Sequence, residues 1–268
     1  DGRTITLGAN SSGTTVTNGL TYNVTIASGT ATVILSGGTL SNAATQTLVN
    51  GISYQNTNID NPTDGNRVFT LTQIVDSGGT ANGGVSTTTL AVASTVNVNP
   101  VNDAPTLDLD GSITGTGYTT TYFRNIDTPV RVADTDLVLA DVDSAQLNRI
   151  RVEITGNYSN GNDLLTFTAN VNTGSVSGAW DAANARMTLS GTGTVAQYQA
   201  ALAAVTFTST TGNTNTRTIT ITPRDTSNAS GTAATATIAV SNATTTPVAE
   251  VVTATGTEDQ VGAIPVVL

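Results

Sequence analysis

The side chains best suited to chemistry in this sequence are acids and amides whose oxygen atoms could bind a cation. Asn102 and Asp103 lie between two prolines, Pro100 and Pro105, where one alternating stretch ends and another begins. Because proline fixes φ and cannot donate to a sheet ladder, the two prolines predict a short, stiff connector. Carboxylate and amide oxygens are hard ligands, so we interpret the connector as a hinge between two β-domains that a cation could lock.

Further acids that could offer oxygen ligands occur later in the chain. Asp141 and Asp143 are separated by one residue, so on an extended chain both carboxylates point the same way. Asp225 closes a predicted turn after Pro223 and Arg224. Ca²⁺ takes about six to eight oxygen ligands and usually draws them from several segments. Asp and Asn also favour turns, so a purely structural role for these acids stays open.

Three other acidic stretches have alternative interpretations. Asp134 and Asp136 either add to the same negative field or cap a loop, and we favour the loop. Residues 60–65 resemble a calcium-binding loop, but Pro62 stands where a ligand is needed, so a turn is favoured. Residues 108–111 have the pattern of a strand end, with metal binding as the less favoured alternative.

Composition excludes several classes of function. The 268 residues include no cysteine and no histidine, which removes disulfides, cysteine nucleophiles and every catalytic triad that uses histidine. The net charge of −10 would repel a phosphate backbone, so nucleic acid is a poor partner and divalent cations are good ones. No apolar run approaches the length of a membrane span, so no membrane insertion is expected. Nothing in the pattern sets two acids beside an aromatic-lined cleft, so we do not expect an enzyme.

The alternation of apolar and polar residues predicts that the chain is built mostly from β-strands, and that these strands position the acids. Clear half-buried strands are expected at residues 20–26, 68–74, 90–98 and 150–154, with turns at Gly, Asn and Asp between them. One helix is expected at residues 195–203, because Thr194 and Gln197 have the spacing of a capping box. The many short strands favour β-sandwiches.

Parts of the sequence also resemble one another. The stretches beginning at Thr32, Leu48 and Arg67 are similar to those beginning at Arg186, Leu202 and Arg217, and 94–99 is similar to 237–242. An internal repeat of this kind predicts two related units. The first unit has no counterpart for roughly the first fifty residues of the second.

The connector "NPVNDAP" resembles the inter-domain linker of cadherins and of the cadherin-like repeats in giant bacterial surface adhesins. The resemblance implies an all-β chain of tandem Ig/cadherin-like Greek-key β-sandwiches arranged as a rod. It assigns residues 1–101 to a partial repeat and 102–105 to a linker. It assigns 106–242 to a complete repeat and 243–268 to a further linker with the start of another repeat. The ragged ends suggest an excised or processed part of a longer protein.

The same resemblance implies a set of ligands for Ca²⁺. By order and approximate spacing, the cadherin ligands correspond here to Asn102, Asp103, Asp141, Asp143 and Asp225. Two features depart from the family pattern. The linker contains fewer acidic residues than the family's linker does, and the first unit has no Asp-Arg-Glu sequence corresponding to that of the family. The second linker, before Pro247, contains no acid, and we expect weaker cation binding there.

The expected function is that of a structural stalk segment in a secreted or cell-surface bacterial adhesin or fibre protein, with Ca²⁺ tuning its stiffness. Its partners would be neighbouring repeats, and the apolar tail 261–268 could pair head-to-tail with the next subunit. The alternative is a β-sandwich module that binds a glycan or a protein, which would need a pocket or an exposed aromatic patch. Trp180 could serve as a sugar platform, but packing in the core is the favoured interpretation.

Overall fold

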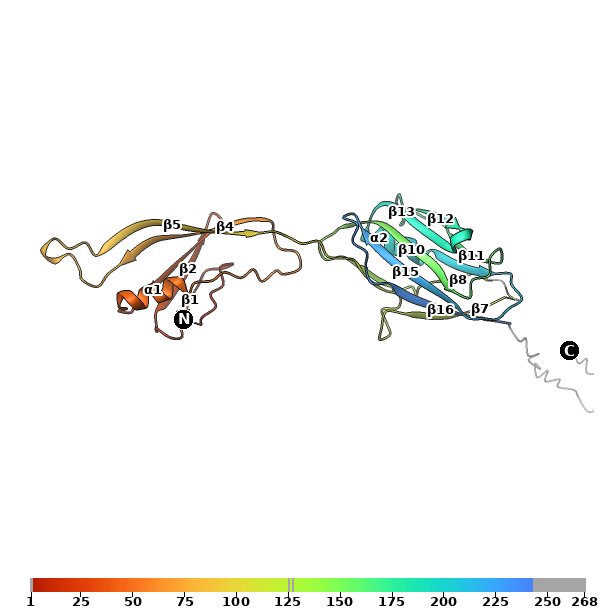
Figure 1. Ribbon diagram of the computed structural model, residues 1–268, viewed down its shortest axis with the longest axis horizontal. Helices are drawn as coiled ribbons and strands as arrows, with labels where there is room; N and C mark the ends of the chain where they lie inside the picture. The colour runs from red at the N-terminus through yellow and green to blue at the C-terminus, as the bar shows by residue number, and fades with distance from the viewer. Residues whose placement is uncertain (1, 125, 127, 243–268) are drawn as a thin grey trace, which may run out of the picture. The chain divides into compact units, whose positions relative to one another are not determined.

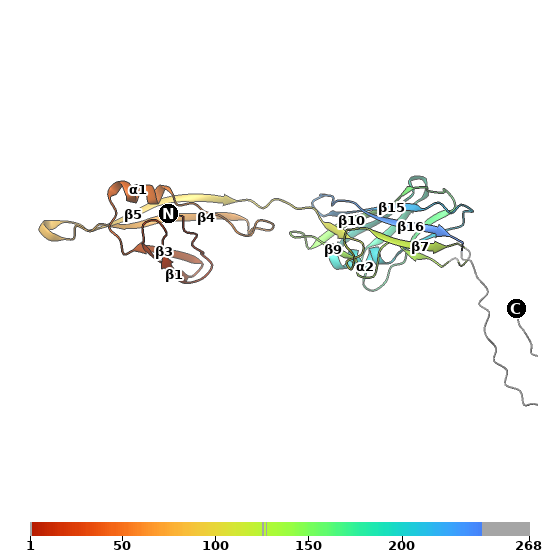
Figure 2. The ribbon, with the colours of Figure 1, turned by 90° about the horizontal axis from the view of Figure 1, so that it is seen from below.

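The chain divides into two compact units, Asp1–Pro100 and Val101–Leu268, and each is built mostly from β-strands (Figure 1, Figure 2). The computed structural model describes residues 2–124, 126 and 128–242. The predicted all-β class is therefore confirmed at the level of strands and sheets. The second linker and the tail 243–268, including the predicted strand donor 261–268, lie outside the described residues.

Unit 1 contains two separate antiparallel sheets and one α-helix. The first sheet has the order β1-β2-β3, and the second is the long hairpin β4-β5. Ser28 and Gly29, with φ of 49° and 77°, form the tight turn between β2 and β3 that the sequence predicted. The elements are β1 (Ser11–Thr14), β2 (Thr21–Ala27), β3 (Thr30–Ser36), α1 (Asn42–Asn50), β4 (Gly65–Val75), the short 3₁₀ helix η1 (Ala81–Gly83) and β5 (Thr87–Val98).

The core of unit 1 is small. Its buried apolar side chains in the described residues are Leu20, Tyr22 and Val24, all on or next to β2. Helix α1 buries no side chain, and Val68 of β4 and Val92 of β5 stay well exposed. Burial of hydrophobic side chains is the main favourable term in folding. Because so few are buried here, the described part of unit 1 gains little stability from this term.

Unit 2 is a sandwich-like arrangement of sheets around one core. A six-stranded sheet has the order β12-β13-β10-β15-β16-β7, and smaller sheets have the orders β11-β14-β8 and β6-β9. Every pairing in it is antiparallel except β16 with β7. The strands are β6 (Thr106–Asp108), β7 (Tyr118–Phe123), β8 (Val130–Arg131), β9 (Val138–Ala140), β10 (Gln146–Gly156), β11 (Asp163–Phe167), β12 (Ser177–Asp181), β13 (Arg186–Thr194), β14 (Val205–Ser209), β15 (Arg217–Asp225) and β16 (Ala234–Ser241).

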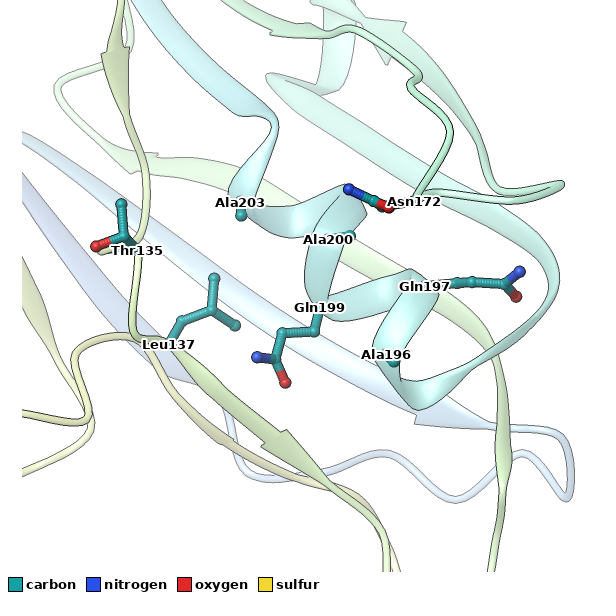
Figure 3. Close-up of a pocket in the computed structure, with 8 residues that line it drawn as sticks. All are labelled: Thr135, Leu137, Asn172, Ala196, Gln197, Gln199, Ala200 and Ala203. Atoms are coloured by element: carbon teal, nitrogen blue, oxygen red, sulfur yellow. The ribbon is translucent and has the colours of Figure 1, made fainter.

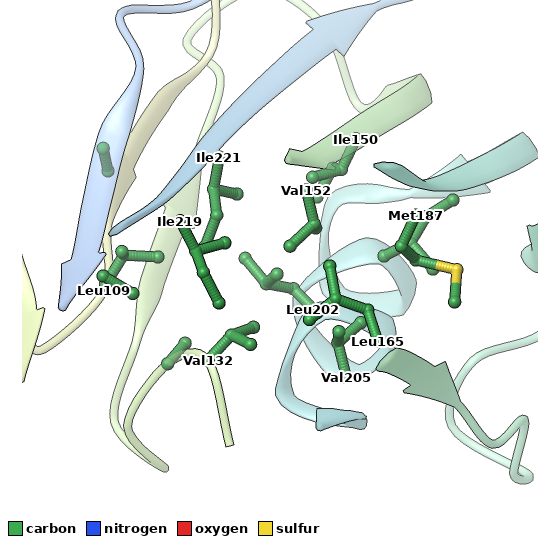
Figure 4. Close-up of a cluster of buried hydrophobic side chains, with 14 of the residues drawn as sticks. Leu109, Val132, Ile150, Val152, Leu165, Met187, Leu202, Val205, Ile219 and Ile221 are labelled. Carbon is green, nitrogen blue, oxygen red and sulfur yellow. The ribbon is translucent and has the colours of Figure 1, made fainter. Parts of the chain in front are cut away.

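Alternation along the central strands creates the core of unit 2. On β10 the side chains of Ile150 and Val152 are buried, and on β15 those of Ile219 and Ile221 are buried. Figure 4 shows these side chains meeting Leu202 and residues of the smaller sheet. The sequence predicted this burial from a period of two.

Two α-helices are present in the described residues, where the sequence predicted one. The predicted helix is confirmed as α2 (Val195–Ala203), and Thr194 and Gln197 form its capping box. Helix α1 was missed, although Ser41 caps it through its side chain and it also has nine residues. Ala44 stands at its third helical position, so α1 lacks the Glu or Gln that completes a capping box and that marked α2 in the sequence.

A buried ion pair joins β11 to β15 inside unit 2. Arg217 Nε lies 2.8 Å from Asp163 Oδ2, and both side chains are 0% exposed. Asp163 also accepts hydrogen bonds from Ser209 Oγ and from the Ser159 amide. A buried charge needs such partners, and this network links the smaller sheet to the six-stranded sheet across the core.

Candidate metal site

A short ladder at one end of unit 2 brings the connector beside the predicted Asp pair. β6 and β9 run antiparallel with Thr106 opposite Ala140. Residues a few places before Thr106 therefore lie across from residues a few places after Ala140. In this way the fold brings Asp103 to Asp143, forty residues further along the chain.

Hydrogen bonds connect the five predicted ligand residues. The Asp103 amide donates to Asp143 Oδ2 at 2.9 Å, and Asn102 Nδ2 donates to Asp225 Oδ2 at 2.7 Å. The Asp143 amide donates to Asp141 Oδ1 at 3.2 Å. All five residues belong to unit 2, and three separate segments contribute them. These bonds join Asp103 to Asp143 and Asp141, and they join Asn102 to Asp225.

Asp225 is fixed by the end of β15 and by the turn that follows it. It pairs with Leu147 of β10, and its side chain is 0% exposed. The Ala229 amide donates to Asp225 Oδ1 at 2.9 Å, and the Asp225 amide donates back to the Ala229 carbonyl. This turn holds the carboxylate toward Asn102.

Gly231 lets the connector approach that turn. A Cβ atom at this position would overlap the Pro105 carbonyl oxygen. The Gly231 amide also donates to the Pro223 carbonyl at 3.0 Å. Glycine is therefore required by the close backbone contact. Sequence reasoning missed this residue, because a lone glycine after a turn has no distinguishing pattern.

Two carboxylate oxygens at the centre of this group lack hydrogen-bond partners. Asp141 Oδ2 and Asp143 Oδ1 are both buried and unpaired. Buried carboxylate oxygens are normally satisfied, because leaving one without a partner costs free energy. The lack of hydrogen-bond partners at these two oxygens fits a cation site, because a bound cation would interact with both of them.

Electrostatics at Asp141 agree with this picture. Burial raises the pKa of its carboxyl, and the neighbouring Asp143 raises it further. The Ser144 amide, 2.8 Å from Asp141 Oδ1, opposes the shift by stabilising the charged form. Two neighbouring carboxylates repel each other, and a bound cation would relieve that repulsion.

A second acidic group lies at the other end of the same ladder. Carboxylate oxygens of Asp110, Asp134 and Asp136 lie within 4.8 Å of one another. Asp110 accepts from the Ser112 amide and hydroxyl, and Asp134 accepts from the Thr135 amide and hydroxyl. Asp134 thus makes the local bonds of a loop cap, and both Asp134 and Asp136 lie with Asp110.

The remaining candidate residues from the sequence lie in a loop, in a turn or against the core. Asp60 and Asp64 are exposed in the loop before β4. Asp76 accepts from the Gly78 amide at 2.8 Å in a turn after β4. Trp180 is half-buried against the core, with its ring centroid 6.3 Å from that of Tyr158. The core interpretation of Trp180 is therefore confirmed.

A shallow pocket lies beside α2 on the surface of unit 2. Its volume is about 450 Å³. Figure 3 shows amide and small aliphatic side chains around it, including Gln197, Gln199 and Asn172. No aromatic or charged side chain lines it, whereas ligand pockets usually combine apolar and aromatic walls with a few convergent polar groups.

No protein-family model matches the sequence, and no curated protein matches it. Within the described part of the chain, every helix is too short or too polar to cross a membrane.

Proposed function

We propose that the chain is a structural stalk segment of a secreted or cell-surface adhesin or fibre protein, and that Ca²⁺ binds at the connector end of unit 2. The β-sandwich-like fold and the acidic composition support a structural role. The observation that carries the calcium site is the pair of buried, unpartnered oxygens, Asp141 Oδ2 and Asp143 Oδ1.

The donor set suits a hard cation. Asp103, Asp141, Asp143 and Asp225 offer carboxylate oxygens, and Asn102 offers an amide oxygen. All ligands would be oxygen, which Ca²⁺ prefers, and the chain contains no cysteine and no histidine. Asp141 and Asp143 would face the ion, while the connector residues and Asp225 would close the site from two sides.

Binding at these residues would have a mechanical consequence. Asp103 now meets the Asp141–Asp143 loop through a single amide hydrogen bond, and Asn102 meets Asp225 through one side-chain bond. A cation shared among these segments would replace weak tethers with several short bonds to oxygen. The connector would then be held firmly at the start of unit 2, which is the stiffening that a tandem stalk needs.

Calorimetric titration of the whole chain with Ca²⁺ tests this proposal. Asp141→Asn combined with Asp143→Asn should abolish binding, because it removes both unpartnered carboxylates. Asp134→Asn combined with Asp136→Asn is the matched control, with the same change of charge in the other acidic group, and should leave the heat of binding in place. Binding that is lost only in the control variant would place the ion at Asp110 and overturn the assignment.

The alternative of a glycan- or protein-binding module gains no support from a specific feature. It required a pocket or an exposed aromatic patch. The pocket beside α2 is lined by amide and small aliphatic side chains, and a second pocket of about 260 Å³ beside the connector is lined by Ala, Pro, Thr and Ser residues with Leu107. We therefore keep the stalk as the proposed function.

A further inference from the structure

The outward face of the six-stranded sheet in unit 2 carries a group of arginines. On β10, Arg149 and Arg151 alternate with the buried residues Ile150 and Val152, so their side chains point away from the core. Arg224 holds an outward position on β15. The chain has only nine basic residues and a net charge of −10, so three arginines at one place are a local exception.

Strand pairing sets these three side chains next to one another. Arg149 of β10 lies directly opposite Arg224 of β15, and Arg151 follows two residues further along β10. Side chains directly opposite on antiparallel strands start about 5 Å apart, and those two residues apart on one strand start about 7 Å apart. Three long side chains that start this close can reach one common point above the sheet. We call Arg149, Arg151 and Arg224 the arginine patch.

The surroundings of the arginine patch do not balance its charge. The acid that follows on β10, Glu153, is already paired, because Arg186 Nε lies 2.7 Å from its Oε1. The cross-strand neighbours of the patch on this face are the hydroxyl residues Ser190, Thr188 and Thr222. Like charges directly opposite each other destabilise a sheet, so the pair of Arg149 and Arg224 costs stability unless an anion offsets it.

Arg149 lies at the centre of the patch and lacks a partner for one of its donors. Its Nε atom is buried and has no hydrogen-bond partner among the described residues. Buried donors are normally satisfied, because leaving one unpaired costs free energy. Burial also lowers the pKa of the Arg149 guanidinium, and the neighbouring Arg151, Arg224 and Arg186 lower it further. An anion bound above Arg149 would stabilise its charged form.

We propose that the arginine patch binds one tetrahedral oxyanion group of the phosphate or sulfate class. Arginine presents a planar fork of donors that matches the oxygens of such a group, and hydrogen bonds between opposite charges are the strong ones. The bound group supplies an acceptor for Arg149 Nε and offsets the repulsion among the guanidiniums. Arg224 is positioned for this role, because its Nε donates to Asn148 Oδ1 at 3.0 Å.

The charges around the patch select a single anionic group rather than a polyanion. Glu153 follows Arg151 by two residues and ends the positive row on β10. The rest of the chain is acidic and would repel a long series of phosphates. Charges further away than about 8 Å are largely screened at physiological ionic strength, so the local positive charge dominates at the patch itself.

Titration of the whole chain with inorganic phosphate, followed by two-dimensional NMR of the arginine Nε–H groups, tests this proposal. Calcium is first removed on a chelating resin, so that neither calcium nor a chelator competes. The Arg149 Nε–H signal should shift and reach saturation, and inorganic sulfate should shift it in the same way. Acetate should bind about tenfold more weakly, because it carries one charge and only two oxygens.

Paired variants separate the arginine patch from the charge of the whole chain. Arg149→Gln combined with Arg151→Gln should weaken phosphate binding by about tenfold or more, read from the Arg224 Nε–H signal and by calorimetry. Arg124→Gln combined with Arg131→Gln removes the same charge elsewhere in unit 2 and should leave the affinity unchanged. Circular dichroism checks that both variants are folded. If the double variant folds poorly, Arg151→Gln alone should still weaken binding.

The source of the bound group is tested with phenyl phosphate, in which the same group is attached to a larger body. Binding at least as tight as that of inorganic phosphate would assign the patch to a group carried on a larger molecule. Weaker binding at the same residues would assign it to the free ion. Either result supports the oxyanion site.

Three results would overturn the proposal. The first is an Arg149 Nε–H signal that does not shift and saturate with phosphate. The second is equal binding of acetate, which would show attraction by charge alone. The third is an equal loss of affinity in the variant of Arg124 and Arg131, which would show an effect of net charge rather than of the arginine patch.

Discussion

At the scale of single residues, the buried pair of Asp163 and Arg217 should contribute strongly to the stability of unit 2. Asp163→Ala leaves the Arg217 guanidinium buried without its counter-charge, so the free energy of unfolding should fall by about 3–5 kcal/mol. Urea denaturation followed by circular dichroism measures this loss. The matched control is Glu153→Ala, which breaks the half-exposed pair with Arg186 and should cost about 0–1 kcal/mol. Equal effects of the two variants would contradict the assignment.

The raised pKa of Asp141 predicts a pH dependence in the calcium-free protein. Folded Asp141 holds its proton more tightly than the unfolded chain does, because burial and Asp143 disfavour its charged form. The free energy of unfolding should therefore fall as pH rises from the ordinary carboxyl pKa through the raised folded value. Asp141→Asn should remove this part of the pH dependence, as measured by thermal melts in a chelator.

Asp181 provides a control of opposite sign. Hydrogen bonds from the Asn184 side chain and amide lower its pKa. Asp181 therefore adds to the free energy of unfolding above the ordinary carboxyl pKa. This contribution is lost as pH falls through the lowered pKa of the folded protein. A pH profile in which Asp141→Asn and Asp181→Asn act in the same direction would show that the assigned causes are wrong.

At the scale of elements, the contact between the connector and the turn after β15 depends on Gly231. Gly231→Ala places a Cβ atom against the Pro105 carbonyl oxygen, so the connector must move away. We expect a loss of stability and weaker Ca²⁺ binding, because Asn102 and Asp103 would leave Asp225 and Asp143. Calorimetry with Ca²⁺ and thermal melts measure the two effects.

Gly212→Ala is the matched control for that variant. A Cβ atom at Gly212 would meet only Arg124 Nη1 at 3.8 Å, which is ordinary contact. This substitution should leave both the melting temperature and the calcium affinity nearly unchanged. If Gly231→Ala behaves in the same way, the connector is not held by the close approach at Pro105.

Strands were easier to predict from the sequence than helices or close contacts. The alternation at residues 68–74, 90–98 and 150–154 corresponds to β4, β5 and β10, because a period of two is a local signal. Helix α1 was missed because Ala44 stands where a capping box needs Glu or Gln. The turn at Gly231 was missed because its cause lies more than a hundred residues away at Pro105.

At the same scale, the candidate site was predicted only through a family resemblance. The residues Asn102, Asp103, Asp141, Asp143 and Asp225 are spread over more than a hundred positions, so no local pattern joins them. Their meeting depends on the β6-β9 ladder and on the end of β15 beside β10, which are long-range pairings. The sequence could not predict that Asp134 would join Asp110 at the other end of that ladder.

At the scale of the whole molecule, the central claim is that Ca²⁺ bound at unit 2 holds the connector and so stiffens the stalk. The site residues include the connector itself, so binding should restrict the motion of the chain just after Pro100. Removing the ion should leave the sheets of unit 2 folded, since its large cluster of buried hydrophobic side chains does not depend on the ion.

Small-angle X-ray scattering of the whole chain, in Ca²⁺ and in chelator, tests this claim most directly. We expect chelation to broaden the distribution of intramolecular distances, and Asp141→Ala combined with Asp143→Ala to give the chelated profile even in Ca²⁺. Circular dichroism should show the same strand content in every sample. Coincident scattering profiles in Ca²⁺ and in chelator would contradict the account, because the connector would then be held by packing alone.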